Sequence, residues 1–113
     1  METAILSLVK EYPQYKFPGH RDRKQSENSG EEFRDDILIP FLNKNKGKKI
    51  IIDLSGATGY PPSFLDEAFA GCIERGIMDI IEAEIKGIDE VERERIQRYI
   101  GKAIDKKEKG SGK

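Results

Sequence analysis

The sequence predicts an α/β fold in which strands and helices alternate along the chain, and three observations support this. Residues Ile50–Leu54 form a continuous apolar run rather than an alternating one, so we expect a central strand covered on both faces. Residues 29–42 and 63–76 carry apolar side chains at helical spacing behind capping signals. Residues 81–86 alternate apolar and charged side chains, as in a strand with one wet face. This order indicates a small layered domain.

The N-terminal segment is compatible with two structures. Ala4–Val9 is apolar and short, and Tyr12–Phe17 follows it after a turn at Pro13. The second stretch alternates aromatic and polar residues, which favours a hairpin of two strands. A helix that opens within Ile5–Val9 is the alternative. The polar stretch His20–Gly30 is expected to be an exposed loop.

The first long helix is predicted to begin after Ser29. Glu32 stands three positions further on, at the spacing of a capping box. Pro40 falls inside the helical pattern and should kink or divide the helix near Ile39, because it lacks a backbone donor. The residues on its apolar face are Phe33, Ile37, Leu38, Phe41 and Leu42.

A tightly specified connection, Ser55–Pro62, leads from the central strand into the second helix; it holds two glycines and two prolines in a short span. Ser63 is the expected N-cap, and Asp66 and Glu67 favour the positive end of the helix. Gly76 is a fitting stop signal. The buried stripe is predicted to be Phe64, Leu65, Ala68, Phe69, Cys72 and Ile73.

A last helix is predicted to start at or beside Asp89, with a charged outer face. Its inner residues are expected to be Val91, Ile96, Tyr99, Ile100 and Ala103. The residues from Lys106 to Lys113 are charged and rich in glycine, so they are predicted to form a disordered tail. Residues 1–105 would then make up a single domain.

The composition of the chain argues against several classes of function. Among 113 residues, 20 Lys and Arg balance 21 Asp and Glu, and the net charge of −1 argues against a dedicated nucleic-acid binder. One cysteine and one histidine leave little scope for a disulfide, a zinc cluster or acid–base chemistry. The sequence shows no apolar run of membrane-spanning length and no signal peptide, so we expect a cytoplasmic protein without membrane contact.

The unit Ile50–Ile73 is where we expect function. A helix N-terminus after a buried strand favours an anion, so the loop 56–63 could hold a phosphate, or Ser63 could carry one. The plainer interpretation is that Ser63 only caps its helix.

Three segments resemble a known family. Ile50–Leu54, Pro62–Ala68 and Ser29–Arg34 are similar to recurrent segments of the STAS-like domain family of bacterial proteins, and the likeness spans about Ser29 to Ile104. The resemblance implies the fold of anti-sigma-factor antagonists, with a mixed sheet of about four strands and helices mainly on one face. It also implies regulation by docking to a partner protein, often a histidine-kinase-like ATPase.

In the antagonists a phosphorylated hydroxyl begins the helix after the central strand, and by resemblance that role falls on Ser63. The chain departs from their Asp-Ser-Ser-Gly-like turn, because it has Pro61-Pro62-Ser63-Phe64 there. The candidate partner-binding residues are Gly56, Thr58, Gly59, Tyr60, Ser63, Asp66 and Glu67.

Other residues support simpler interpretations. His20 and Asp22 could suggest a metal pair, but a solvated loop is the preferred interpretation because no third ligand stands nearby. Cys72 falls on the apolar stripe and is predicted to be a core residue.

The leading hypothesis is a regulatory binding module that is not an enzyme and needs no cofactor. The alternatives are a small nucleotide- or phosphate-binding protein and an accessory subunit of a larger bacterial signalling or defence complex. The sequence leaves the identity of the partner and the oligomeric state open.

Overall fold

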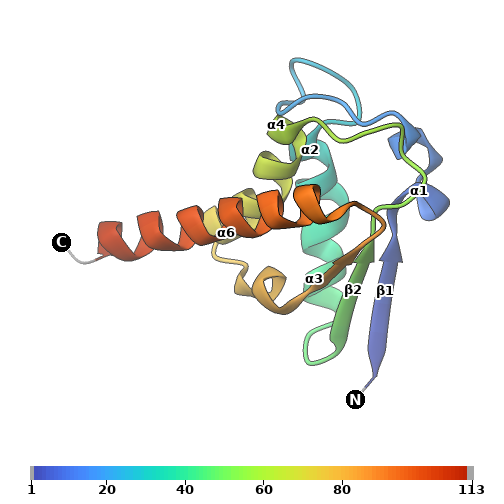
Figure 1. Ribbon diagram of the computed structural model, residues 1–113. Helices are drawn as coiled ribbons and strands as arrows, with labels where there is room; N and C mark the ends of the chain where they lie inside the picture. The colour runs from blue at the N-terminus through green and yellow to red at the C-terminus, as the bar shows by residue number, and fades with distance from the viewer. Residues whose placement is uncertain (1, 112–113) are drawn as a thin grey trace.

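The computed structural model describes residues 2–111, and it confirms the α/β class (Figure 1). Its sheet contains β1 (Thr3–Ser7), β2 (Lys49–Asp53) and β3 (Glu84–Lys86) in the order β1-β2-β3. Both pairs are parallel, with Ile5 beside Ile51 and Ile52 beside Ile85. Within residues 2–111 the sheet therefore has three strands, all parallel, where a mixed sheet of about four was predicted.

The N-terminal segment does not form a hairpin, and the alternative helix within Ile5–Val9 is limited to a turn that begins at Leu8 after a strand. β1 is followed by a single helical turn, α1 (Leu8–Glu11), and by the 3-10 helix η1 (Pro13–Lys16). The hairpin prediction was wrong because β1 pairs with β2, far along the chain, and not with its own neighbour. Tyr15 is buried and Phe17 is exposed, so the alternation of residues 14–17 reflects a tight helical turn and not a strand.

Along the chain, two long helices connect the three strands, and each contains a π-helical stretch in its middle. The first consists of α2 (Gly30–Glu32), η2 (Phe33–Leu38) and α3 (Ile39–Lys44). A proline clashes with the carbonyl four residues before it, and a wider turn relieves that contact. The helix accordingly changes from π to α geometry at Ile39, next to Pro40, where the sequence predicted a kink.

The second long helix consists of α4 (Pro62–Leu65), η3 (Asp66–Ala70) and α5 (Gly71–Glu74). It ends as predicted at Gly76, whose φ is +79° and whose N–H donates to the carbonyl of Ile73. The 3-10 helix η4 (Met78–Glu82) then leads into β3, so the predicted strand over residues 81–86 begins only at Glu84.

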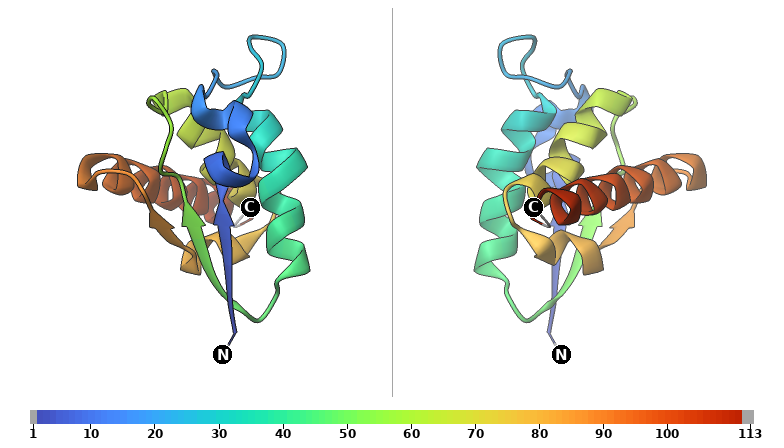
Figure 2. Two further views of the ribbon diagram at one scale, coloured as in Figure 1. Left: turned by 90° about the vertical axis from the view of Figure 1, so that its right-hand side faces the viewer. Right: turned by 90° about the vertical axis from the view of Figure 1, so that its left-hand side faces the viewer.

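Helices cover one face of the sheet, as predicted, and leave the other face open (Figure 2, left). The inward side chains Leu6, Ile50, Ile52 and Ile85 are buried in the core, whereas Ile5 is 55% exposed. The prediction that both faces of the central strand are covered was wrong. Both crossovers move along the sheet in the same direction, so crossovers of the same hand place their helices on the same face.

The last helix, α6 (Glu90–Ser111), is capped by Asp89, whose Oδ1 accepts a hydrogen bond from Glu92 N at 2.8 Å. It extends away from the body of the domain (Figure 1). Ile96 is buried as predicted, but Val91 is exposed. The predicted disordered tail instead continues α6 through Ser111, because Lys and Glu at 106–109 favour helix; residues 112–113 lie outside the described part.

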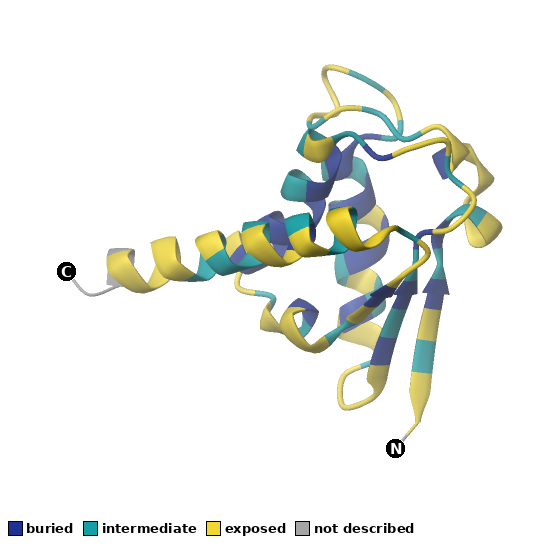
Figure 3. Cartoon of the chain, viewed as in Figure 1, coloured by how far each residue is buried: buried dark blue, intermediate teal, exposed yellow. Residues whose placement is uncertain are grey.

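The distribution of buried and exposed residues in Figure 3 shows a core enclosed between the sheet and the two long helices. Its centre is a group of aromatic rings. Phe33 and Phe64 stack with their centroids 5.8 Å apart, and Tyr15 meets both rings at steeper angles. None of the helices in residues 2–111 is both long enough and apolar enough to cross a membrane.

Candidate partner-binding site

The connection between β2 and α4 crosses the carboxyl end of the sheet and is fixed on both sides. Leu54 N donates to the carbonyl of Lys86 at 2.8 Å, and Thr58 N donates to the carbonyl of Lys16 at 2.8 Å. Gly56 has a φ of +96°, and a Cβ there would lie 3.3 Å from the side chain of Val9. The loop is therefore held against α1 and η1 in a defined shape.

Two further residues shape the beginning of this connection. The Oδ1 atom of Asp53 accepts a hydrogen bond from Ser55 N at 2.9 Å, and hydrogen bonding from Ser55 lowers the pKa of the Asp53 carboxyl. Gly87, with a φ of +84°, packs so closely that a Cβ would lie 2.3 Å from Ser55 N. The carboxyl ends of β2 and β3 therefore hold the loop where it starts.

The predicted loop residues divide into exposed and buried ones. Gly56, Thr58 and Gly59 are exposed, whereas Tyr60 is only 7% exposed. The hydroxyl of Tyr60 donates to the carbonyl of Leu54 at 2.8 Å, and burial raises its pKa. Tyr60 therefore anchors the loop from below, while the other three form its outer surface.

Phe17 extends this outer surface, and the sequence did not identify it as a candidate. It is 63% exposed, and it directly follows Lys16, whose carbonyl holds Thr58. The Lys16 Nζ lies 5.8 Å from the centroid of the Phe17 ring. Phe17 alternates with polar neighbours, and this pattern predicted a half-buried strand. The sequence therefore contained no sign that the Phe17 ring lies in solvent.

Ser63 lies in the first turn of α4 but does not cap it. The N-cap is Pro61, and its carbonyl accepts hydrogen bonds from Phe64 N at 3.0 Å and Leu65 N at 3.3 Å. Pro62 occupies the first helical position, which suits proline because no partner is needed for a backbone N–H there. The half-exposed Ser63 lies two positions after the N-cap, inside the first turn, and the capping prediction was wrong.

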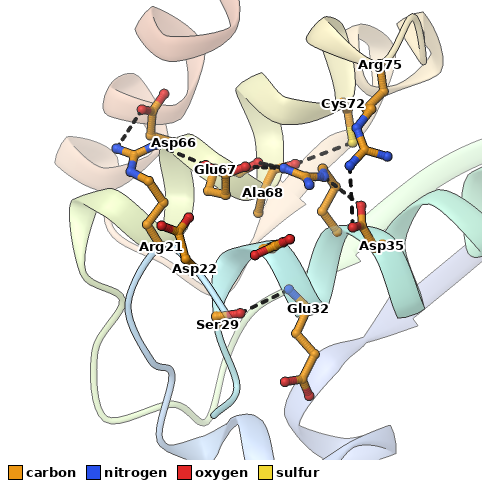
Figure 4. Close-up of polar contacts among 12 residues, drawn as sticks. Arg21, Asp22, Ser29, Glu32, Asp35, Asp66, Glu67, Ala68, Cys72 and Arg75 are labelled. Atoms are coloured by element: carbon orange, nitrogen blue, oxygen red, sulfur yellow. Dashed lines mark hydrogen bonds and ion pairs between the residues drawn. The ribbon is translucent and has the colours of Figure 1, made fainter. Parts of the chain in front are cut away.

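Asp66 and Glu67 face the loop before α2 and belong to a chain of ion pairs (Figure 4). Arg21 contacts the Asp66 carboxylate at 2.9 Å and the Glu67 carboxylate at 3.2 Å. Glu67 also pairs with Arg34, which in turn donates to its carbonyl at 3.1 Å. Both carboxylates, predicted to act on the positive end of the helix, instead link the second long helix to the 20–30 loop.

Arg34 is the centre of the chain of ion pairs and is only 4% exposed. Its Nε lies 2.8 Å from Asp35, which Arg75 also contacts at 3.5 Å. Burial acts to lower the pKa of Arg34, but the bonds and charges of Asp35 and Glu67 outweigh it and leave the pKa raised. A buried guanidinium with satisfied partners fixes the two long helices to each other. The Ser29–Arg34 segment contained this residue, but its sequence neighbours gave no sign of burial.

A close approach between their backbones and an N-cap fix the start of the same helix pair. A Cβ on Gly30 would lie 2.5 Å from the carbonyl oxygen of Phe64. Ser29 caps the first long helix as predicted, since its Oγ accepts from Glu32 N at 3.1 Å. The surface formed by Gly56, Thr58, Gly59, Phe17 and Ser63 is thus mounted on a rigid pair of helices.

The structure also shows where Cys72 and His20 lie. Cys72 is buried as predicted; its Sγ donates to the carbonyl of Ala68 at 3.4 Å, and burial raises the pKa of the thiol to about 12. Within residues 2–111 no group of three His, Cys, Asp or Glu side chains could hold a metal ion, and His20 is exposed in its loop.

Comparison with known proteins identifies one family. Residues 29–92 match the family described as a STAS-like domain of unknown function. No curated protein and no solved structure gives a significant match. The matched range includes Ser29, Arg34, β2, the loop and both long helices, which is more than half of the chain. The chain therefore belongs to the STAS-like domain family.

Proposed function

We propose that this chain is a cytoplasmic regulatory module, without enzymatic activity of its own, that docks a partner protein through residues 56–63 and Phe17. The observation that carries the proposal is the exposed phenyl ring of Phe17 next to Lys16, whose carbonyl holds Thr58 N in a loop where Gly56, Thr58 and Gly59 are exposed. Aromatic side chains are enriched in protein–protein interfaces, so an exposed ring on an ordered surface supports docking there.

The rigidity of this surface favours binding. Tyr60 fixes the loop from the core, and the Thr58–Lys16 hydrogen bond fixes it to η1. A surface that is already ordered loses little conformational entropy when a partner binds, so more of the contact energy appears as affinity. A histidine-kinase-like ATPase is the proposed partner, on the strength of the family resemblance.

Ser63 is the proposed regulatory position. Its hydroxyl is half-exposed, and no capping hydrogen bond engages it. Asp66 and Glu67 follow three and four positions later, on the same face of the helix, and both pair with Arg21. A phosphate on Ser63 would compete with these carboxylates for Arg21 and would alter the surface that the partner meets.

The docking proposal is tested by capture of the candidate ATPase on the immobilised chain. We expect Phe17→Arg and Thr58→Arg each to reduce capture at least tenfold, while both variants keep the circular dichroism spectrum of the wild type. Asn43→Arg, which changes an exposed residue at the far end of the first long helix, is the matched control and should capture normally. Undiminished capture by both loop-surface variants would exclude this surface as the interface.

The phosphorylation proposal has a separate test. The chain is incubated with the ATPase and ATP, and the modified peptide is mapped by mass spectrometry. Phosphate on Ser63, absent from Ser63→Ala, supports the proposal. If the ATPase turns over a stoichiometric amount of ATP and the chain stays unphosphorylated, the chain is a docking module that Ser63 phosphorylation does not regulate.

A further inference from the structure

The open face of the sheet has an apolar centre. Ile5 and Ile51 are register partners on β1 and β2, and both side chains lie on the face that no helix covers (Figure 2, left). Ile5 is more than half exposed, and Ile51 is partly buried. Parallel sheets are almost always covered on both faces, so an open one calls for an occupant.

Opposite charges lie at equal distances on either side of this centre. Lys49 precedes Ile51 by two positions and Asp53 follows it by two, so all three side chains share the open face. At about 3.3 Å per residue, each charge stands roughly 6.6 Å from Ile51 along the strand. Thr3 and Ser7 flank Ile5 in the same way on β1.

We propose that two copies of this chain associate face to face through the open sheet. The two-fold axis runs across the strands, between the two sheets, at the level of Ile5 and Ile51. Each of these isoleucines then meets its own counterpart. Lys49 meets Asp53 of the second copy, and Asp53 meets Lys49 of the second copy, because the two charges are equidistant from the axis.

The proposed axis also places Glu84 opposite Glu84 of the second copy, because Glu84 is the register partner of Ile51, and each of these carboxylates is paired with Lys49 and Lys86 of its own chain. The arrangement still fits better than the other two-fold stacking, which would place Lys49 opposite Lys49 and Asp53 opposite Asp53. An axis parallel to the strands would place β1 over β3, and Ile5 would face Glu84, because Ile51 is the register partner of both. The proposed axis also suits the shape of the face. α1 and η1 stand at the carboxyl end of β1, whereas its amino end is uncovered (Figure 2, left). Rotation about the proposed axis places the uncovered amino end of each β1 opposite α1 and η1 of the other copy.

The strength of the association follows from the size of the face. Five-residue strands are about 17 Å long and neighbouring strands lie about 4.8 Å apart. Two such strands and the three-residue β3 offer much less than the roughly 800 Å² per partner of a standard interface, so we expect a dimer that forms in the high micromolar range.

Charge reversal tests the symmetry directly. We expect the wild type to shift from monomer to dimer in sedimentation velocity between about 10 μM and 1 mM. Lys49→Glu puts two carboxylates opposite each other at both ends of the dimer, and Asp53→Lys puts two ammonium groups there. Each variant alone should stay monomeric, with at least tenfold weaker association. An equimolar mixture of the two should dimerise again, because every introduced charge then meets an opposite one.

The mixture separates contact between copies from effects within a chain. Position 49 neighbours Glu84, whose Oε1 lies 3.8 Å from Lys49 Nζ, and position 53 neighbours Lys86. Both variants therefore suffer repulsion within the chain, and Asp53→Lys also loses the bond to Ser55 N. Mixing leaves these effects unchanged, so recovery can come only from the interface. Should either variant fail to fold, Ile5→Glu replaces an exposed side chain and should also be monomeric.

Three results would overturn the proposal. The first is a wild-type protein that remains monomeric up to about 1 mM, which would mean that a different protein covers the open face of the sheet. The second is a dimer that Ile5→Glu does not weaken, which would place the contact at a sheet edge or on α6. The third is a mixture of the reversal variants that stays monomeric. Phe17→Arg and Thr58→Arg should dimerise as the wild type does, so loss of partner docking and loss of self-association are distinguishable.

Discussion

The guanidinium of Arg34 lies directly against Gly71 on the neighbouring helix. A Cβ at Gly71 would stand 2.5 Å from Nη1 and 2.9 Å from Cδ of Arg34. The absence of a side chain at position 71 is what allows a long cation to lie between the two long helices and reach Glu67. Helix packing and the buried ion pairs therefore depend on the same residue pair.

Gly71→Ala should destabilise the fold. The added methyl group must displace Arg34 or separate the helices, and overpacking of this kind costs about 1–3 kcal/mol. Gly101→Ala is the matched control, since a Cβ at this position of α6 meets nothing within 4 Å. We expect that control to gain up to about 1 kcal/mol from helix propensity. Urea unfolding of both variants checks the prediction, and equal effects of the same sign would contradict it.

Ser29→Ala and Ser63→Ala should differ in stability although the sequence predicts an N-cap at both positions. The Ser29 hydroxyl accepts from Glu32 N and is fully buried, so its loss should cost about 1–2 kcal/mol. Ser63 makes no capping bond, so its loss should change the free energy of unfolding by less than about 0.5 kcal/mol. Thermal unfolding measures both. A cost at Ser63 equal to that at Ser29 would show that its hydroxyl has a structural role.

The two serines illustrate how far the sequence predicts the structure. Capping signals and helical periodicity are local, so both long helices, the strand at Ile50–Leu54 and the stop at Gly76 could be predicted. The choice between Ser63 and Pro61 as N-cap depends on the path of the preceding loop, which is held by η1. That information lies in a tertiary contact and not in the spacing of residues.

Errors at the sheet have the same origin. Ala4–Val9 was expected to pair with the next segment, but β1 pairs with β2 more than 40 positions later. The local pattern of an apolar strand does not specify its neighbour, and a parallel pair needs a crossover that periodicity cannot reveal. For the candidate site, the loop was found from its glycines and prolines, while Phe17 and Arg34 were not. Arg34 is buried by its contact with Glu67, and Phe17 joins the site because the adjacent Lys16 holds Thr58; both contacts are remote in sequence.

Tyr60→Phe should weaken the attachment of the loop to the core while keeping the aromatic packing. The variant loses the hydrogen bond from the hydroxyl to the carbonyl of Leu54, and the ring still contacts Phe64, with centroids 5.4 Å apart. We expect a cost of about 1–2 kcal/mol, because a buried carbonyl loses its partner. Tyr12→Phe, at an exposed ring, should change stability little. Hydrogen exchange at loop amides should accelerate only in Tyr60→Phe, and unchanged exchange there would contradict the anchoring role.

The pH dependence of stability should include a contribution from Asp53. Hydrogen bonding from Ser55 lowers the folded-state pKa of this carboxyl below its ordinary value of 3.8. Between the two values the unfolded chain binds more protons than the folded chain, so acid favours unfolding. The stabilisation is therefore present above the unfolded pKa and is lost as the pH falls through the folded pKa.

Asp53→Asn keeps an oxygen acceptor for Ser55 N but does not titrate, so its free energy of unfolding should fall less steeply below about pH 4. Asp105→Asn, at an exposed position of α6, should leave the acid limb unchanged. Urea titrations across the acid range decide the matter, and equal flattening in both variants would mean that the loss reflects net charge and not the Asp53–Ser55 bond.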